Sequence, residues 1–388
     1  MTKLLKQLKI KKKAYQVYVQ TNTETAKEIY RQERNKTKAL TRKLHDESWN
    51  QFIGTIEHDV HGRQLMAYKT LKHINKNEKD TANLNVIPEH KWLEHYTNLW
   101  YNEGITADNN DRDDEFSEYE GDLISMTELE EALNKTKNRK ATGQDGLNAE
   151  LFKYGDTLLK LRLLHLYNMC WKMQQVPQDW STAQVISIFK KGKRNDCNNY
   201  RGICLIDTAY KIYAKIINKR LQNISEYLIL EEQNGFRKGR SCIDNTFIVK
   251  QLIEKHREYN KETHLAFIDF EKAFDRIDRN ILWCILEEQG YPQQLIRTIQ
   301  GLYYQTKITV KNNFKISKKI PVNQGVRQGC SISPTLFNIY IDDLVKKWKK
   351  LVDPGFKISR DSYINILLFA DDLVIIQNKE SALQKSVF

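Results

Sequence analysis

The sequence predicts an α+β fold, because segments with helical and with strand-like patterns follow one another without strict alternation. Apolar residues make up 40% of the 388 residues, which is enough for a sizeable core, and no internal repeat is present. Helical spacing of apolar residues indicates helices, and short apolar runs bounded by polar residues indicate strands. The predicted helices cover residues 24–75, 147–173, 210–223, 242–259, 278–289 and 334–350; the predicted strands cover 183–189, 203–206, 264–270, 307–311 and a hairpin over 364–376.

The net charge of +13 favours a polyanionic partner, either nucleic acid or an anionic membrane face. No apolar run approaches the roughly 18–20 residues of a membrane-spanning helix, and the N-terminus lacks the apolar region of a secretory signal. Nucleic acid is therefore the predicted partner, without a membrane, and the predicted location is intracellular, in the nucleus or the cytoplasm. The six cysteines are scattered without a CxxC pair, which is typical of reduced thiols and not of a disulfide framework or zinc site.

The charge is unevenly distributed and suggests domain boundaries. Residues 1–50 carry a net charge of +8, whereas residues 103–131 carry −11. We expect a basic helical N-terminal extension over residues 1–100. Within it, residues 24–75 would be either a solvated helical hairpin or a basic arm along a phosphate backbone. Residues 101–126 are predicted to be an acidic linker. Thr127 with Glu130 then resembles a capping box that begins a helix.

Two acidic motifs form the strongest candidate site. Asp371 and Asp372 lie between two apolar β-type runs in INILLFADDLVIIQ, and Asp269 ends the apolar run of AFIDF. Alone, the first is compatible with an ordinary hairpin turn and the second with a strand end that caps a helix. Together, a hairpin tip and a strand end can lie side by side in one antiparallel sheet. Three converging carboxylates suit two Mg²⁺ ions, with Mn²⁺ as an alternative, and would support in-line phosphoryl transfer.

A glycine turn and a helix follow in NQGVRQGCSISPTLFNIYIDDL. The turn at Gln328 and Gly329 would allow close backbone approach to a nucleotide, or would be an ordinary loop before a packed helix. Asp342 and Asp343 form a second acidic pair, which we expect on the helix surface.

Two basic segments are candidates for binding phosphate. Lys190, Lys191 and Arg201 lie in IFKKGKRNDCNNYRGICLI, a hairpin that would be solvated or would neutralise a triphosphate. In GFRKGRS, three cations are predicted to contact the template backbone: Arg237, Lys238 and Arg240.

These features occur in the order found in the reverse transcriptase domain of non-LTR (LINE-type) retrotransposons, which the chain resembles from about residue 138 to its last residue. Six collinear blocks carry the resemblance: PQDWSTAQVISIFKKG, NYRGICLIDTAYKIYAKIINKRL, EEQNGFRKGRS, FIDFEKAFD, GVRQGCSISPTLFNIYIDDL and LLFADDLVII. Residues 29–100 are similar, less specifically, to the linker that precedes the polymerase in such elements.

The resemblance implies a right-hand polymerase fold, with fingers over 127–260 and a palm over 261–388. It also implies roles for individual residues. Asp269, Asp371 and Asp372 would be the catalytic metal ligands, joined by the carbonyl of Phe270. Binding of dNTP would involve Lys190 or Lys191, Arg201, Gln328 and Gly329, and also Phe274, whose ring would exclude a 2′-OH.

The implied activity is RNA-directed DNA synthesis, in which a DNA primer 3′-OH on an RNA template attacks a dNTP. The chain ends sixteen residues after Asp372, so we expect a domain truncated before the primer grip and thumb, with impaired activity. The alternative is a catalytically inactive RNA-binding remnant of a transposable element. A related RNA-synthesising polymerase or telomerase is a third hypothesis, and Phe274 argues against RNA synthesis. The sequence does not give the oligomeric state.

Overall fold

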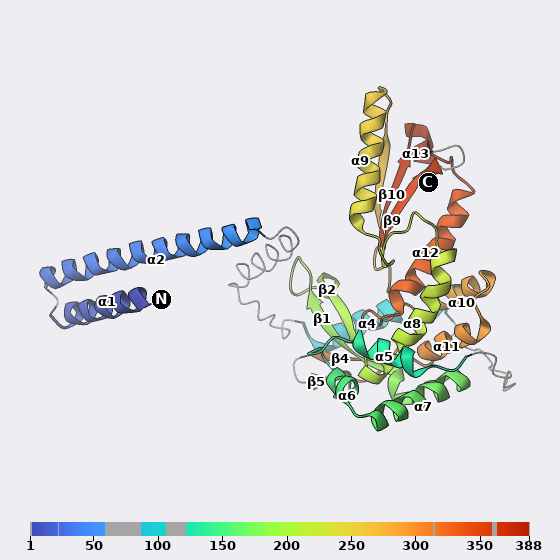
Figure 1. Ribbon diagram of the computed structural model, residues 1–388, viewed down its shortest axis with the longest axis horizontal. Helices are drawn as coiled ribbons and strands as arrows, with labels where there is room; N and C mark the ends of the chain where they lie inside the picture. Colours follow the sequence, from blue (N-terminus) through green and yellow to red (C-terminus); the bar gives the residue numbers. More distant parts are fainter. Residues whose placement is uncertain are drawn as a thin grey trace. The chain divides into compact units, whose positions relative to one another are not determined.

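The computed structural model describes residues 2–21, 23–58, 87–105, 122–312, 315–358 and 363–387 (Figure 1). The chain divides into two compact units, Met1–Ala82 and Asn83–Phe388. Most of the predicted acidic linker, and the predicted helical residues 59–75, lie outside the described residues. In the part of the chain that is described, no helix is both long and apolar enough to cross a bilayer.

The first unit contains two helices, α1 (Thr2–Thr21) and α2 (Glu24–His58), that pack along one another as a hairpin. The amide of Gln7 donates to Glu33 at 2.6 Å, and the ring of Tyr30 stacks on that of Tyr18 with centroids 6.2 Å apart. The start of α2 agrees with the predicted helix over 24–75, whereas α1 was covered only by the general prediction of a helical extension.

The second unit is built on two sheets. The five-stranded sheet has the order β2-β1-β4-β5, with β6 also paired to β4; β1 runs antiparallel to β2 and parallel to β4. The second sheet has the order β3-β10-β9, and a separate two-stranded β7–β8 ladder packs against β9 and β10. The strands are β1 (Thr182–Phe189), β2 (Tyr200–Leu205), β3 (His264–Asp269), β4 (Lys307–Asn312), β5 (Lys315–Ile316), β6 (Ile320–Pro321), β7 (Phe356–Lys357), β8 (Tyr363–Ile364), β9 (Ile366–Phe369) and β10 (Asp372–Gln377).

A small apolar cluster joins residues 248–252 to strands β7–β10. Most helices pack around the two sheets and contribute to one large apolar core. Helix α8 (Thr208–Leu228) crosses this core and contacts α5, α11 and α12. The fold therefore mixes strands and helices without regular alternation, as the sequence predicted. The remaining helices are α4 (Glu89–Trp100), α5 (Met126–Asn134), α6 (Ala149–Tyr154), α7 (Thr157–Met173), α9 (Cys242–Glu258), α10 (Arg279–Glu288), α11 (Gln293–Tyr303), α12 (Ser333–Lys349) and α13 (Glu380–Val387), with 3-10 turns η3 (Gln178–Ser181) and η4 (Cys197–Asn199).

Local hydrogen bonds changed two of the predicted helix boundaries. The single helix predicted over 147–173 is two helices, because Asp156 accepts from Leu159 N at 2.8 Å and caps the start of α7. The capping box uses Ser125 and Glu128, two residues before the predicted pair.

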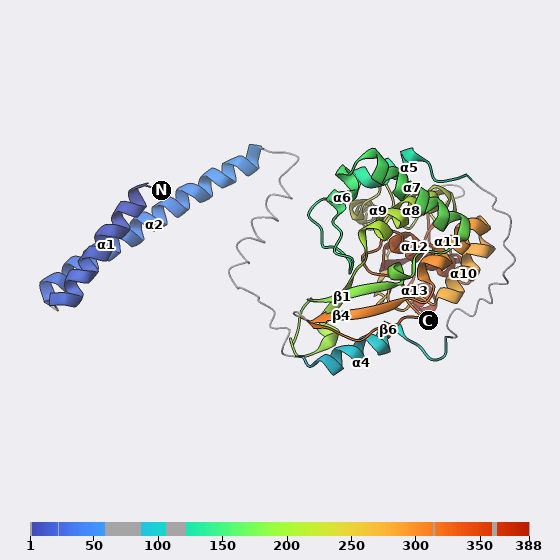
Figure 2. The same ribbon diagram turned by 90° about the horizontal axis from the view of Figure 1, so that it is seen from below.

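Helix α4 does not belong with the predicted extension over 1–100. Its residues Trp92, Tyr96 and Trp100 are buried in the core of the second unit, and the helix lies alongside β4 and β6 (Figure 2). These aromatic residues are spaced four apart, so they share one face of the helix, and they bury it against the sheet.

Candidate active site

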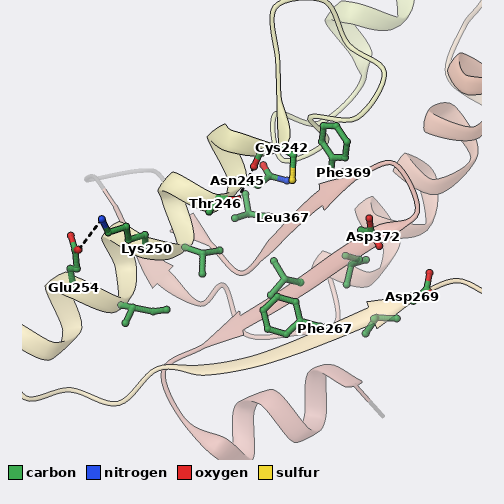
Figure 3. A pocket seen from close by; sticks show the side chains of 15 residues that line it. Cys242, Asn245, Thr246, Lys250, Glu254, Phe267, Asp269, Leu367, Phe369 and Asp372 are labelled. Carbon is green, nitrogen blue, oxygen red and sulfur yellow. Dashed lines mark hydrogen bonds and ion pairs between the residues drawn. The ribbon is translucent and has the colours of Figure 1, made fainter. Parts of the chain in front are cut away.

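The acidic motifs meet in the three-stranded sheet. Strand β10 pairs antiparallel with β3 so that Asp372 is the direct register partner of Asp269. Directly paired residues project from the same face of a sheet, with Cβ atoms about 4.5–5.5 Å apart. Figure 3 shows both carboxylates at the same end of the sheet. The fold thus brings together one acid from each of two motifs about a hundred residues apart, Asp269 and Asp372; the convergence of all three acids on one metal site stays a prediction.

Asp371 lies beside this pair, in the two-residue turn that joins β9 to β10. The turn is closed by the pairing of Phe369 with Asp372, and its first residue, Ala370, has a φ of +60°. A left-handed φ at a residue with a Cβ is uncommon and persists only where the surroundings fix it. The turn therefore has a fixed, strained backbone at the position of the acid pair.

A neighbouring loop holds the hairpin tip. The Gln233 side-chain oxygen accepts from Ala370 N at 3.1 Å and from Gly235 N at 2.8 Å. A Cβ added to Gly235 would lie 2.1 Å from Ala370 N, so only glycine fits there. Gln233 was not predicted as a site residue from the sequence. The only indication was its position two residues before Gly235, the glycine that begins GFRKGRS.

The charges of the three acids are not compensated by ion pairs with residues that the structure describes. Asp269 and Asp372 are exposed and Asp371 is half-buried, and none of the three forms an ion pair with a described residue. Closely spaced carboxylates without a counter-charge repel one another, and a divalent cation would relieve that repulsion. No group of three or more His, Cys, Asp or Glu side chains in the described ranges is close enough to hold a metal alone. Further ligands would therefore be needed from backbone, water or substrate.

An apolar groove opens beside the acid pair. It has a volume of about 740 Å³ and lies between α9 and the face of β3, β10 and β9 that carries Asp269 and Asp372 (Figure 3). Phe267, two residues before Asp269 on the same face, is 77% exposed there. Exposed aromatic surface in the middle of a strand is unusual and marks this face as open.

The aromatic residue predicted to contact the sugar packs against α12. The ring of Phe274 stacks on Phe337 with centroids 4.8 Å apart and planes 12° from parallel, and Phe236 meets it edge-on at 6.0 Å. The Phe274 carbonyl accepts from Val326 N at 2.9 Å. Both its ring and its backbone are thus fixed.

The Gln328–Gly329 turn lies against strand β2. The Gln328 carbonyl accepts from Cys204 N at 2.9 Å. Gly329 has a φ of +114°, and an added Cβ would lie 2.8 Å from the Cys204 carbonyl oxygen. The turn thus requires glycine, for its conformation and for its close approach to β2.

The basic hairpin joins β1 to β2. Lys190 and Lys191 are exposed at its tip, and Arg201 is exposed on β2 opposite Ile188. The connection reaches the segment after β3, because Lys272 Nζ donates to Asn198 Oδ1 at 3.3 Å. Lys272 also has a φ of +55°, and the sequence analysis did not identify it.

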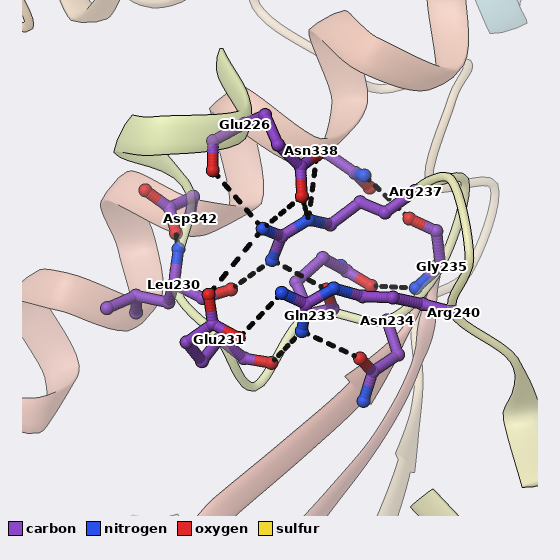
Figure 4. Close-up of polar contacts among 10 residues, drawn as sticks. All are labelled: Glu226, Leu230, Glu231, Gln233, Asn234, Gly235, Arg237, Arg240, Asn338 and Asp342. Atoms are coloured by element: carbon purple, nitrogen blue, oxygen red, sulfur yellow. Dashed lines mark hydrogen bonds and ion pairs between the residues drawn. The ribbon is translucent and has the colours of Figure 1, made fainter. Parts of the chain in front are cut away.

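The structure corrects the prediction for Arg237. Its side chain is only 3% exposed and donates to Glu226 Oε1 and the Leu230 carbonyl oxygen, both at 2.8 Å (Figure 4). A guanidinium committed to protein acceptors cannot also neutralise template phosphates. Arg237 instead ties the end of α8 to the loop that holds the hairpin.

The other two cations of GFRKGRS differ from Arg237. Arg240 donates to Glu231 Oε2 at 2.6 Å and retains 24% exposure, so it is largely engaged within the protein. Lys238 is exposed. A template contact by these two residues stays a prediction.

In the second acidic pair, on α12, the first acid is buried instead of lying on the helix surface. Asp342 is 2% exposed, accepts from Leu230 N at 2.8 Å and pairs with Lys346 at 2.6 Å. Asp343 pairs with Lys347 at 2.8 Å. The expectation of a surface position was wrong for Asp342, because α8 and its following loop cover that side of α12.

Comparison with known proteins identifies the family. A family profile described as "Reverse transcriptase (RNA-dependent DNA polymerase)" matches residues 188–387, slightly more than half of the chain.

Similar curated proteins come from transposable elements. The chain is 28% identical over 264 residues to "Transposon TX1 uncharacterized 149 kDa protein" of Xenopus laevis, covering 66% of this chain and 20% of that protein. It is 26% identical over 265 residues to the "Retrovirus-related Pol polyprotein from type-1 retrotransposable element R2" of Nasonia vitripennis, covering 68% and 25%. It is 25% identical over 266 residues to the "RNA-directed DNA polymerase from mobile element jockey" of Drosophila melanogaster, covering 67% and 28%.

The chain thus spans about a fifth to a third of the length of such relatives. The family match includes the acid-bearing sheet, the glycine turn and the basic hairpin described above. The chain belongs to the reverse transcriptase (RNA-dependent DNA polymerase) family and carries a domain of the non-LTR retrotransposon type.

Proposed function

We propose that this chain acts as an RNA-directed DNA polymerase that adds dNTPs to a DNA primer 3′-OH on an RNA template. The observation that carries the proposal is the register of β3 and β10, which pairs Asp269 with Asp372 beside the Asp371 turn. Within the second unit, residues 127–260 would serve as fingers and residues 261–388 as palm. The basic helices of residues 1–58 would form an N-terminal extension.

The acid site suits divalent ions. Its donors are carboxylate oxygens, which Mg²⁺ and Mn²⁺ prefer, and no described cation already neutralises them. Asp269, Asp371 and Asp372 would hold the ions together with the Phe270 carbonyl. When bound, a pair of such ions stabilises the attacking and leaving oxygens of an in-line phosphoryl transfer. The remaining ligands would be water and substrate phosphates.

The nucleotide would bind between the basic hairpin and the palm. Lys190 or Lys191, and Arg201, are exposed and available to neutralise the triphosphate, as Lys272 would also be. The Gln328–Gly329 turn would position the nucleotide against the template. The stacking of Phe274 on Phe337 fixes the position of the Phe274 ring, and a fixed ring supports its role in excluding a 2′-OH.

The proposed polymer partners are an RNA template and a DNA primer. The net charge of +13 favours phosphate contacts, and Lys238 is exposed next to the acid-bearing hairpin. An inactive RNA-binding remnant has no support in the described residues, because the paired acids, the glycine turn and the basic hairpin are all present. An intracellular location, in the nucleus or the cytoplasm, stays a prediction.

Primer extension on poly(rA)/oligo(dT) with dTTP and Mg²⁺ tests the proposal. We expect Asp269→Asn to lower the extension rate by about a thousand-fold, because roughly 4 kcal/mol of charge stabilisation in the transition state is lost. Asp343→Asn is the matched control, since it removes an acid that is already paired with Lys347. Equal rates for wild type and Asp269→Asn would contradict the proposed function.

The same assay tests the sugar contact. Phe274→Ala is expected to raise the rate of UTP incorporation relative to dTTP by about ten-fold, because one steric contact is worth about 1–3 kcal/mol of discrimination. Phe236→Ala is the control, as it removes a ring that touches Phe274 without altering Phe274 itself. An unchanged UTP/dTTP ratio in Phe274→Ala would exclude this residue as the sugar-selecting group.

A further inference from the structure

A buried hydrogen-bond chain connects α4 to the nucleotide-binding turn. The indole Nε1 of Trp100 donates to Asp275 Oδ1 at 2.9 Å. The side-chain Nε2 of Gln328 donates to the same carboxylate, at 2.8 Å to Oδ1 and 2.9 Å to Oδ2. Trp100 and Asp275 are 5% and 7% exposed, so water does not compete for these hydrogen bonds.

The backbone around this chain is fixed from both sides. The Trp100 carbonyl accepts from Asn323 N at 3.1 Å and from Gln324 N at 3.3 Å, while Gln324 Nε2 donates to the Leu99 carbonyl at 2.8 Å. On the other side, a Cβ added to Gly325 would lie 2.7 Å from the Asp275 carbonyl oxygen. The segment that leads into Gln328 is thus held between α4 and the turn after β3.

The carboxylate determines which way the Gln328 amide faces. An ionised carboxylate can only accept hydrogen bonds, so it requires the NH₂ end of the amide and turns Oε1 away. No described residue donates to that oxygen, and Gln328 is only half-buried. An acceptor is therefore left for a ligand, at the turn that the proposed function assigns to dNTP binding.

The pKa of the buried Asp275 carboxyl lies above its usual value, and the surrounding donors and cations limit that rise. Burial raises its pKa, but the hydrogen bonds from Trp100 and Gln328 and the nearby charges of Lys272 and Lys190 oppose that rise. The two lysines come from the segment after β3 and from the basic hairpin. The groups that face this carboxylate are thus donors or cations.

We propose that Asp275 and Trp100 are positioning residues, which hold the Gln328 carboxamide with its oxygen toward a hydrogen-bond donor of the incoming nucleotide. This inference rests on the proposed polymerase function and goes beyond it. It makes α4, which lies outside the family-matched residues 188–387, part of the nucleotide site. Asp275 touches Gln328 and not the substrate, so its loss should act on nucleotide binding more than on the chemical step.

An acid–amide exchange provides the sharpest test. In Asp275→Asn the Trp100 bond keeps the amide oxygen at the Oδ1 position, so the new NH₂ group takes the Oδ2 position, 2.9 Å from the Gln328 NH₂ group. Turning the Gln328 oxygen inward relieves this contact between two donors. We therefore expect the KM for dTTP to rise about ten-fold with kcat within about three-fold. Gln328→Glu alone places two carboxylates together and should be worse. The double variant Asp275→Asn/Gln328→Glu restores a donor–acceptor pair and an outward oxygen, so KM should return to within about three-fold of wild type. Multiplicative effects of the two single changes would overturn the inference.

Trp100 is tested against a matched tryptophan of the same helix. Trp100→Phe keeps a ring to stack on Tyr96, where the centroids are 4.7 Å apart, but removes the Nε1–H. Trp92 also stacks on Tyr96, at 5.8 Å, and makes no contact with Asp275. We expect Trp100→Phe to raise the KM for dTTP about three- to five-fold and Trp92→Phe to leave it within about two-fold. Equal KM changes in the two variants would show that α4 acts through packing alone.

A readout without catalysis separates this inference from the polymerase proposal. The indole N–H resonance of Trp100 can be assigned by its loss in Trp100→Phe. If the hydrogen-bond chain exists, Asp275→Asn and Gln328→Glu each shift this resonance, whereas Asp343→Asn does not. A wild type that extends no primer but shows these shifts would contradict the proposed activity and keep the hydrogen-bond chain. A resonance that moves in neither variant would overturn the inference whether or not primer is extended.

Discussion

The chain contains two Asp–Asp pairs, and their surroundings are opposite. Asp371 and Asp372, at the tip of the β9–β10 hairpin, form no ion pair with a described residue, and Asp372 is the register partner of Asp269 on the neighbouring strand. On α12, Asp342 and Asp343 are each paired with the lysine four residues later. The same dipeptide therefore stabilises the fold on the helix and leaves uncompensated charge on the hairpin. The difference shows that partners, and not residue type, separate the acids that are paired within the protein from those proposed to bind ions.

The largest effect should come from breaking the buried pair. Asp342→Ala leaves Leu230 N without its acceptor and leaves Lys346 only the Leu228 carbonyl, so we expect the free energy of unfolding to fall by about 3 kcal/mol. Asp372→Ala removes an exposed, repelled charge and should change it by less than about 0.5 kcal/mol. Urea denaturation of both variants measures this contrast. An Asp372→Ala protein as unstable as Asp342→Ala would break the comparison.

Arg237 extends the contrast to cations. Arg237→Lys keeps the charge but cannot reach Glu226, Leu230 and Gln233 together, so we expect a loss of about 2–3 kcal/mol in urea denaturation. Lys238→Ala, one residue away and exposed, is the control and should be nearly neutral. A neutral Arg237→Lys would mean that the buried guanidinium contributes little to holding the hairpin loop.

Divalent ions should stabilise the folded protein only by binding at Asp269 and the two hairpin acids. At a Mg²⁺ concentration ten times the dissociation constant, wild type should gain about 1.4 kcal/mol of stability, seen as a higher Tm. Asp269→Asn should lose this gain, and Asp343→Asn should retain it. A gain that persists in Asp269→Asn would place the ion elsewhere.

The smallest effect concerns the exposed lysine. Lys238→Ala should lower the slope of log affinity for RNA against log salt concentration by about one, because one phosphate contact is lost. Arg237→Lys should leave the slope unchanged, since the side chain is 3% exposed. Filter binding over a salt series distinguishes the two. An unchanged slope in Lys238→Ala would remove it from the template path.

The pairing of the two acidic motifs could be predicted from the sequence for a local reason. Apolar runs that end in acids fix both the strand and the position of its end, and antiparallel pairing of a hairpin with a neighbouring strand then brings Asp269 next to Asp372. The glycine turn was likewise predictable, because the positive φ of Gly329 depends on its own residue type.

Burial of charged residues could not be predicted in this way. Arg237 and Asp342 look like surface residues in the sequence, and only the packing of α8 and its following loop supplies their partners. The contact of Trp100 with Asp275 joins residues 175 positions apart, which no local pattern encodes. The four-residue spacing of Trp92, Tyr96 and Trp100 did indicate a packed helix face and was overlooked.

The central claim is that the hairpin acids and Asp269 act together as one divalent-ion site. Electron paramagnetic resonance of Mn²⁺, titrated into the protein with poly(rA)/oligo(dT) and dTTP, counts the bound ions directly. The claim predicts that Asp269→Asn and Asp372→Asn each lose bound Mn²⁺, while Asp342→Asn and Asp343→Asn keep the wild-type number. Full Mn²⁺ binding in both Asp269→Asn and Asp372→Asn would contradict it.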